Sequence, residues 1–249
     1  MLGFSLEGAN GIGDKLIFSS FPENYFKNTN EKVIDLDSCW IFDHNPYVIR
    51  NEIPDKTINL FSELWSTPTL DEFIQKPIFN SVAERTMSIF KMKVYLRHPR
   101  LYIYENEDML KRVVIHTSGK TRGILNDSVL EHIVKKYKDY KLIQVGAKED
   151  KDINCESIKD SRGCDIWDVV KIIAQSGIFI GVDSGPSWIA ACYPQIFNKK
   201  VLCWDKDYLE NKLVPGHKMN NDFHWYNYGF TYYNQTLQDI GISYSYLKI

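Results

Sequence analysis

A short turn near residue 180 has the residue types expected of an anion-binding turn: two polar residues and a glycine that follow an apolar run. Asp183, Ser184 and Gly185 come directly after Ile178–Val182, a charge-free, β-branched and aromatic run typical of a buried parallel strand. Pro186 suits the first turn of a helix, where its missing N–H costs nothing. The exposed amides of such a turn would bind a phosphate or diphosphate; they are those of Ser184, Gly185 and Ser187. The alternative is an ordinary turn in which Asp183 or Ser184 only caps the helix.

A second turn carries two cations. Ser118-Gly119-Lys120-Thr121-Arg122 follows the apolar run Arg112–His116, so its hydroxyls and cations would lie at the carboxyl end of a strand, where a diphosphate can bind. Arg122 offers bidentate geometry and Lys120 a point charge. The spacing is not that of a Walker A loop, and a solvated basic turn is the alternative. His116 ends the strand, and a lone histidine there is more often structural than catalytic.

Two carboxylates lie near the N-terminus. Gly13-Asp14 begins a helical pattern, and Glu7 follows the first apolar run. Asp14 could cap the helix, because a helix N-terminus stabilises a carboxylate anion, which also weakens it as a base. The two Asp-x-Asp pairs, Asp35/Asp37 and Asp205/Asp207, are interpreted as chance occurrences, so no metal site is predicted.

These motifs, in this order along the chain, resemble glycosyltransferase family 9, the ADP-heptose transferases. The usual family form is an apolar strand followed by Asp-Ser/Thr-Gly-x-x-His-x-Ala-Ala, and here Trp188 stands at the His position. The resemblance implies that Asp14, with Glu7 as the reserve candidate, is the general base for an acceptor hydroxyl. It also implies that Lys120 or Arg122 holds the donor diphosphate. It further implies that Asp183 binds donor-sugar hydroxyls.

The activity implied by this resemblance is an inverting, metal-independent transfer of a sugar, heptose in the family, to a glycan or lipopolysaccharide-type acceptor. ADP-heptose would be a co-substrate, and no cofactor is expected. Two other functions remain open: a catalytically silent sugar-nucleotide-binding protein, and a nucleotide-sugar epimerase or hydrolase. A Rossmann oxidoreductase is disfavoured, because neither βαβ turn carries G-x-G-x-x-G.

The elements that must position these residues alternate between strands and helices. Strands are expected at Leu2–Leu6, Lys32–Leu36, Arg112–His116, Lys141–Val145, Ile178–Val182 and Asn198–Trp204, and helices at Lys15–Phe26, Asp127–Lys138 and Trp167–Gln175. Residues 51–104 are less regular, with helices expected at Leu60–Leu64 and Thr69–Met92 and extended segments at Lys93–Tyr95 and Leu101–Tyr104. Residues 215–235 are expected to form an aromatic loop region.

This alternation predicts an α/β fold with two Rossmann-like domains. By resemblance they would face each other across a cleft, the GT-B arrangement. Residues 1–107 would form a reduced, acceptor-side domain, and residues 108–249 the nucleotide-sugar-binding domain and a C-terminal tail.

The amino-acid composition limits the classes of binding partner that can be expected. Thirty basic residues nearly balance thirty-two acidic ones, so no global field favours nucleic acid or an anionic membrane. The start of the chain has no signal-peptide pattern, and no apolar run approaches 18 residues. A cytoplasmic protein is expected, with at most peripheral contact with the inner face of the membrane. Most of the abundant aromatic residues are expected to pack in the core.

Overall fold

The computed structural model describes residues 1–65, 82–103, 111–119, 123–125, 127–182, 184–196, 198–202 and 230–231. The chain divides into two compact units: unit 1 contains Met1–Ile103, and unit 2 contains Tyr104–Leu213 and the strand Phe230–Thr231. The domain boundary predicted between residues 107 and 108 lies outside the described residues.

Unit 2 contains a six-stranded, all-parallel sheet with the order β12-β11-β10-β5-β8-β9. Numbered within the unit, this is the order 3-2-1-4-5-6 of dinucleotide-binding folds, which reverses direction between β5 and β10. The strands are β5 (Arg112–His116), β8 (Lys141–Val145), β9 (Ile158–Asp160), β10 (Ile178–Val182), β11 (Asn198–Leu202) and β12 (Phe230–Thr231). A separate antiparallel hairpin joins β6 (Ser118–Gly119) to β7 (Gly123–Ile124).

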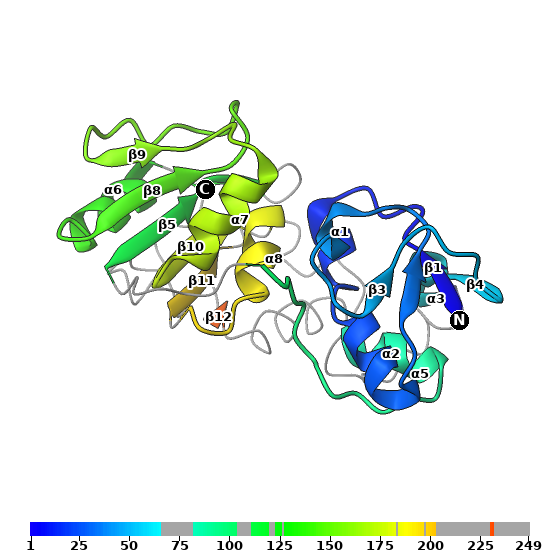
Figure 1. The fold of residues 1–249 in the computed structure, drawn as a ribbon. Coiled ribbons are helices and arrows are strands. Elements are labelled where there is room, and N and C mark those ends of the chain that lie inside the picture. The colour runs from blue at the N-terminus through cyan, green and yellow to red at the C-terminus, as the bar shows by residue number, and fades with distance from the viewer. Residues whose placement is uncertain are drawn as a thin grey trace. The chain divides into compact units, whose positions relative to one another are not determined.

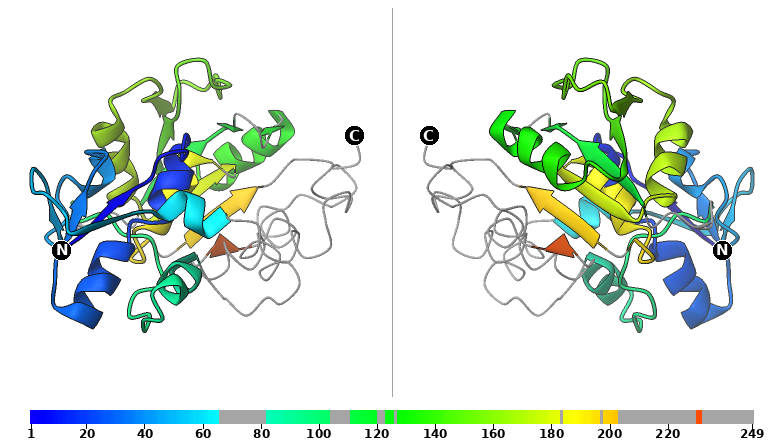
Figure 2. Two further views of the ribbon diagram at one scale, coloured as in Figure 1. Left: turned by 90° about the vertical axis from the view of Figure 1, so that its right-hand side faces the viewer. Right: turned by 90° about the vertical axis from the view of Figure 1, so that its left-hand side faces the viewer.

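Helices cover both faces of this sheet, α6 on one side and α7 on the other (Figure 2). Alternate residues of β10 explain this layering. Ile178, Ile180 and Val182 belong to the buried cluster that includes the apolar face of α6, whereas a side chain at Gly181 would meet Ser187 of α8. The helices are α6 (Asp127–Lys136), α7 (Ile166–Ala174) and α8 (Gly185–Ala191). The prediction of an α/β fold with parallel sheets is confirmed.

Unit 1 contains a four-stranded parallel sheet with the order β3-β2-β1-β4 (Figure 1). Its core is aromatic: the Phe4 ring lies 5.4 Å from that of Phe21 and 5.1 Å from that of Phe42, edge to face. The elements are β1 (Leu2–Ser5), α1 (Ile12–Leu16), α2 (Phe21–Thr29), β2 (Val33–Asp35), a 3₁₀ turn (Trp40–Phe42), β3 (Val48–Ile49), β4 (Lys56–Asn59), α3 (Leu60–Trp65) and α5 (Val82–Ile89).

Several local predictions for unit 1 were wrong. The single helix expected over Lys15–Phe26 is two helices, because α2 begins anew after Ser20 with Pro22 in its first turn. Lys93–Tyr95 is not a strand: the amides of Lys93 and Tyr95 donate to the side-chain oxygens of Asn28 and Asn24 on α2, at 3.1 and 2.7 Å. Leu101–Ile103 is likewise irregular, and the predicted helix over 69–92 is described only from residue 82, as α5.

Other differences concern short strands. The strands β3, β4 and β9 and the β6–β7 hairpin were not predicted, and Phe230–Thr231 forms β12 inside the expected loop region. Within the described ranges, no helix has both the length and the apolar character needed to cross a membrane.

Candidate functional site

His116 and Ser184 meet where the strand order of unit 2 reverses. His116 is the last residue of β5, and it lies opposite Gly181 in the register between β5 and β10. Ser184 follows β10, and its Oγ lies 3.0 Å from His116 Nδ1. The imidazole is buried, at 3% exposure, whereas Ser184 is half-buried. Ligands of open α/β sheets bind at this position, outside the carboxyl ends of the strands.

The other imidazole nitrogen contacts a carboxylate. His116 Nε2 lies 3.2 Å from Asp150 Oδ2, which also accepts a hydrogen bond of 2.9 Å from the Ala147 amide. This approach requires a glycine at position 146: its φ is +139°, and a Cβ there would lie 2.1 Å from Asp150 Oδ2. Ser184, His116 and Asp150 therefore form one continuous hydrogen-bonded chain.

The loop that carries Asp150 is fixed to the end of β5. Thr117 Oγ1 donates to the Lys151 carbonyl at 2.7 Å, and Ser118 Oγ accepts from the Lys151 amide at 2.9 Å. Gln144 Nε2 donates to the same carbonyl at 2.6 Å. Ser118, a predicted ligand-binding candidate, thus has a structural contact that holds the Asp150 loop in place.

The turn into α8 differs from the prediction in the contacts of Ser184 and Ser187. Ser184 is the residue that precedes α8, but its hydroxyl makes no capping bond and contacts His116 instead. The prediction that the Ser187 amide is exposed was wrong: it donates to the Ser184 carbonyl at 3.1 Å, and the fully buried Ser187 hydroxyl donates to Val182 O at 2.6 Å. Gly185 and Trp188 are half-buried.

Three predicted donor-binding residues, Lys120, Arg122 and Asp183, lie outside the described residues, so their roles stay predictions. The described parts of the chain nearest to them are the β6–β7 hairpin, in which Ser118 pairs with Ile124, and Ser184.

In unit 1, Asp14 lies in the first turn of α1, with Gly13 one residue before it. Its Oδ2 accepts a hydrogen bond of 3.0 Å from the Gly11 amide, and the side chain is exposed. Asp14 therefore makes the helix-capping contact that was one of the two alternatives for it in the sequence. This contact uses one of the two carboxylate oxygens of Asp14.

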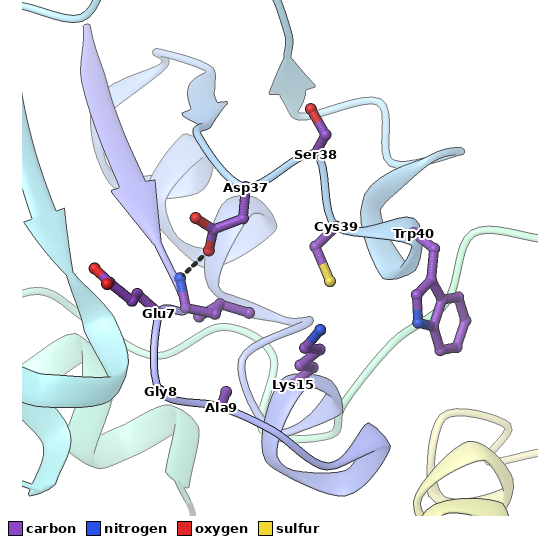
Figure 3. Close-up of a pocket in the computed structure, with 9 residues that line it drawn as sticks. Glu7, Gly8, Ala9, Lys15, Asp37, Ser38, Cys39 and Trp40 are labelled. Carbon is purple, nitrogen blue, oxygen red and sulfur yellow. Dashed lines mark hydrogen bonds between the residues drawn. The ribbon is translucent and has the colours of Figure 1, made fainter.

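A pocket of about 350 Å³ opens in unit 1 at the carboxyl ends of β1 and β2 (Figure 3). The ammonium group of Lys15 points into it beside the Cys39 thiol, while the Glu7 carboxylate points away from Lys15. Among the described residues, no carboxylate lies within ion-pair distance of Lys15. The lining residues are Leu6, Glu7, Gly8, Ala9, Lys15, Asp37, Ser38, Cys39 and Trp40.

A buried carboxylate holds one wall of this pocket. Asp35 accepts hydrogen bonds from the amides of Asp37 and Cys39, at 3.1 and 2.8 Å, and pairs with Arg50 at 3.2 Å. Burial raises the pKa of Asp35 above its ordinary value, although these amides and the guanidinium act in the opposite direction. The Asp37 carboxylate accepts from the Leu6 amide and so ties the two pocket loops together.

Within the described parts of the chain, no group of three or more His, Cys, Asp or Glu side chains is arranged to hold a metal ion.

No protein-family model and no curated protein matches this sequence. Solved structures do match. The chain superposes with a TM-score of 0.60 on the dodecameric, iron-containing glycosyltransferase TibC from enterotoxigenic E. coli H10407, at 15% identity, over 81% of this chain and 57% of TibC. It thus spans less than two thirds of the length of TibC.

Two further structures give similar values. The family 9 glycosyltransferase of Veillonella parvula DSM 2008 has a TM-score of 0.58 and 12% identity, over 81% of this chain and 79% of that one. E. coli heptosyltransferase WaaC, solved with ADP, has a TM-score of 0.59 and 12% identity, over 81% and 87%. The fold is that of the family 9 glycosyltransferases. The resemblance seen in the sequence motifs is confirmed at the level of this family 9 fold.

Sequence reasoning did not reveal how two residues, Gly146 and Asp150, support the site in unit 2. From the sequence alone, Gly146 and Asp150 belong to a polar turn after the strand Lys141–Val145 that could line a nucleotide pocket, although Lys148–Asp152 is more typical of a solvated charged face. The available signal was a glycine directly after a buried strand, followed four residues later by a carboxylate. His116 was considered only as a lone histidine, because nothing local reveals its two partners.

Proposed function

We propose that this protein is an inverting glycosyltransferase that moves a sugar from a nucleoside diphosphate donor to a glycan or lipopolysaccharide-type acceptor. The observation that carries the proposal is the contact between Ser184 and His116 at the reversal of strand order in unit 2. This is the position at which sheets of this order bind nucleotides. ADP-heptose is the donor that the family resemblance suggests.

In this proposal, unit 2 binds the donor. Ser184 and Gly185 contact the diphosphate, Lys120 and Arg122 neutralise the charge that develops on it as it leaves, and Asp183 binds donor-sugar hydroxyls. Stabilisation of the leaving group by fixed cations and donors requires no metal ion, so we propose metal-independent transfer.

Unit 1 supplies the acceptor side of the proposal. Asp14 accepts the proton of an acceptor hydroxyl, whose oxygen forms a bond to the anomeric carbon. The bond from that carbon to the diphosphate oxygen breaks, and its electron pair leaves with the nucleoside diphosphate. The pocket beside Lys15 and Trp40 is the proposed acceptor site, because its volume and its mixture of an aromatic ring with polar groups suit a small polar ligand.

Calorimetric titration with ADP, GDP and UDP tests the donor site. We expect micromolar binding of one nucleotide, and we expect Lys120→Ala to weaken it by about 1.5 to 3 kcal/mol, the contribution of a charge-assisted hydrogen bond. Lys141→Ala is the matched control, because Lys141 is exposed and begins β8, so that it lies at the amino end of the strand and away from the carboxyl ends at which the nucleotide is proposed to bind. If none of the three nucleotides binds, the proposal is wrong.

Asp14→Asn separates catalysis from binding. This variant should bind the nucleotide as tightly as the unchanged protein but lose transfer to an acceptor. Incubation of the intact protein with ADP-heptose alone distinguishes the other two functions: an epimerase or hydrolase consumes the donor without an acceptor, whereas a silent binding protein leaves it intact under all conditions.

A further inference from the structure

The segment that follows α5 in unit 1 carries a local excess of positive charge, although the charges of the whole sequence nearly cancel. No aspartate or glutamate occurs from residue 85 to residue 104. Four cations and an aromatic ring of this segment are exposed to solvent. We call these five residues the basic strip: Lys91, Lys93, Tyr95, Arg97 and Arg100.

Two asparagines of α2 hold the backbone of the basic strip. Asn28 donates from Nδ2 to the Lys93 carbonyl at 2.8 Å and accepts from the Lys93 amide at 3.1 Å. The buried Asn24 accepts from the amides of Tyr95 and Leu96, at 2.7 and 2.9 Å, and donates to the Leu96 carbonyl at 2.7 Å. Because these bonds already order the backbone, a partner that binds the strip loses little affinity to ordering it.

Among the residues that the structure describes, only one cation of the basic strip has an acidic partner. Arg97 pairs with Glu84 at 2.8 Å, and the other three cations form no ion pair there. Glu23 on the adjoining α2 is buried and pairs with Lys27. The described part of the strip therefore has a net positive charge, which attracts an anionic partner.

Tyr95 distinguishes between two classes of anionic partner. Its side chain is 48% exposed, and the Lys93 ammonium lies over the ring, 4.9 Å from the centroid. Single-stranded nucleic acids stack their bases on open aromatic faces, and here a cation covers one face of the ring. Lysine and tyrosine side by side are instead typical of the headgroup level of a membrane, where an anionic leaflet attracts the cations. The strip therefore fits a lipid surface better than a nucleic acid.

We propose that the basic strip binds unit 1 to a membrane surface that contains anionic phospholipids. The inference rests on the lipopolysaccharide-type acceptor proposed above, because such an acceptor is carried in a membrane. Each cation near an anionic leaflet strengthens binding by about fivefold, so the three cations without an acidic partner contribute about a hundredfold.

Co-sedimentation with vesicles of phosphatidylcholine that contain about 30% phosphatidylglycerol tests this proposal. We expect the protein to bind these vesicles in about 0.1 M salt, to leave them in about 1 M salt, and to bind vesicles of phosphatidylcholine alone at least about tenfold more weakly. Binding should weaken by about a hundredfold in a triple variant that removes the three cations without an acidic partner. Its substitutions are Lys91→Gln, Lys93→Gln and Arg100→Gln.

A second triple variant is the matched control, because it removes the same charge from exposed lysines of unit 2 and should bind the vesicles almost as the unchanged protein does. Its substitutions are Lys135→Gln, Lys138→Gln and Lys141→Gln. If the first triple variant does not fold, Lys93→Gln alone should weaken binding by about fivefold. Equal vesicle binding by the two triple variants overturns the proposal, and so does retention of a single-stranded oligonucleotide without binding of the vesicles.

Nucleotide titration of the same proteins separates this inference from the proposed function. The first triple variant should bind its nucleotide as tightly as the unchanged protein, because the donor site is proposed in unit 2. Nucleotide binding without vesicle binding overturns the membrane contact and leaves the transferase proposal in place. Vesicle binding through the basic strip without nucleotide binding supports the membrane contact and overturns the transferase proposal alone.

Discussion

At the residue scale, the contact between His116 and Asp150 depends on the absence of a side chain at position 146. Gly146 combines a φ of +139° with a Cβ position only 2.1 Å from Asp150 Oδ2. Any other residue would have both to adopt a strained backbone and to displace the carboxylate. This glycine therefore determines whether the imidazole has its partner.

We expect Gly146→Ala to weaken nucleotide or pyrophosphate binding by about tenfold or more, beyond a backbone cost of about 1–3 kcal/mol in the free energy of unfolding. The control is Gly163→Ala, which shares a positive φ of +73° but whose Cβ would approach Lys148 at 3.2 Å rather than Asp150. That variant should lose stability and keep its affinity. Denaturant unfolding and calorimetric titration measure the two effects, and full affinity in folded Gly146→Ala would contradict the role assigned to the Asp150 contact.

At the element scale, the segment after β2 depends on one buried ion pair. The Asp35 side chain is 1% exposed and Arg50 31% exposed. Arg50 also donates to the Cys39 carbonyl at 2.7 Å and pairs with Asp43 at 2.7 Å. The pair therefore positions the pocket wall that carries Cys39 and Trp40.

We expect Arg50→Ala to lower the free energy of unfolding by about 2–3 kcal/mol near pH 7, because it leaves Asp35 buried without its cation. This cost is at the low end of the range for a broken buried ion pair, because Arg50 is partly exposed. The pKa of Asp35 is already raised, so the stability it contributes is full below about pH 4 and is lost as pH rises through the raised value. Removing Arg50 raises that pKa further. The deficit of the variant should consequently grow between about pH 4 and about pH 7.

Denaturant unfolding over this pH range measures the deficit. Arg97→Ala is the control, because Arg97 pairs with Glu84 at 2.8 Å but is 63% exposed, so its loss should cost no more than about 1 kcal/mol. A deficit for Arg50→Ala that is constant with pH would mean that the Asp35 charge is not what the arginine stabilises.

At the scale of the whole molecule, the two units have separate sheets and separate cores. The core of unit 1 is aromatic, centred on Phe4, Phe21 and Phe42, whereas the buried cluster of unit 2 between its sheet and α6 is mainly aliphatic. The described residues around Ser184 all belong to unit 2, and the described residues that line the pocket around Lys15 all belong to unit 1.

We therefore expect ADP to protect the two units unequally against amide hydrogen exchange. Amides at 117–119, 146–151 and 184–188 should exchange more slowly, by up to about 100-fold at an ADP concentration 100 times its Kd, while those of β1 and β2 keep their rates. Lys120→Ala should lose this protection at the same ADP concentration. Protection that is strongest in β1 and β2 would place the nucleotide in unit 1 and overturn the assignment.

The sequence by itself determined the strands that consist of a continuous run of mainly apolar residues. The charge-free, β-branched residues of Ile178–Val182 and the runs at Arg112–His116 and Lys141–Val145 predicted strands that the structure has with the same bounds. Because these local patterns alternate with helices, they also predicted the α/β class. The resemblance in the motifs predicted the family 9 fold.

Only the tertiary structure decided which polar side chains meet. Asp150 lies 34 positions from His116, and Ser184 lies 68. The amides at Lys93 and Tyr95, which a local pattern assigned to a strand, instead bond Asn28 and Asn24, 65 and 71 positions away. Local composition fixes whether a segment can be a buried strand, since that depends on its own side chains. The partners of a buried polar group depend on the order of the strands and on the positive φ of Gly146. Neither of these can be read from a short window of sequence.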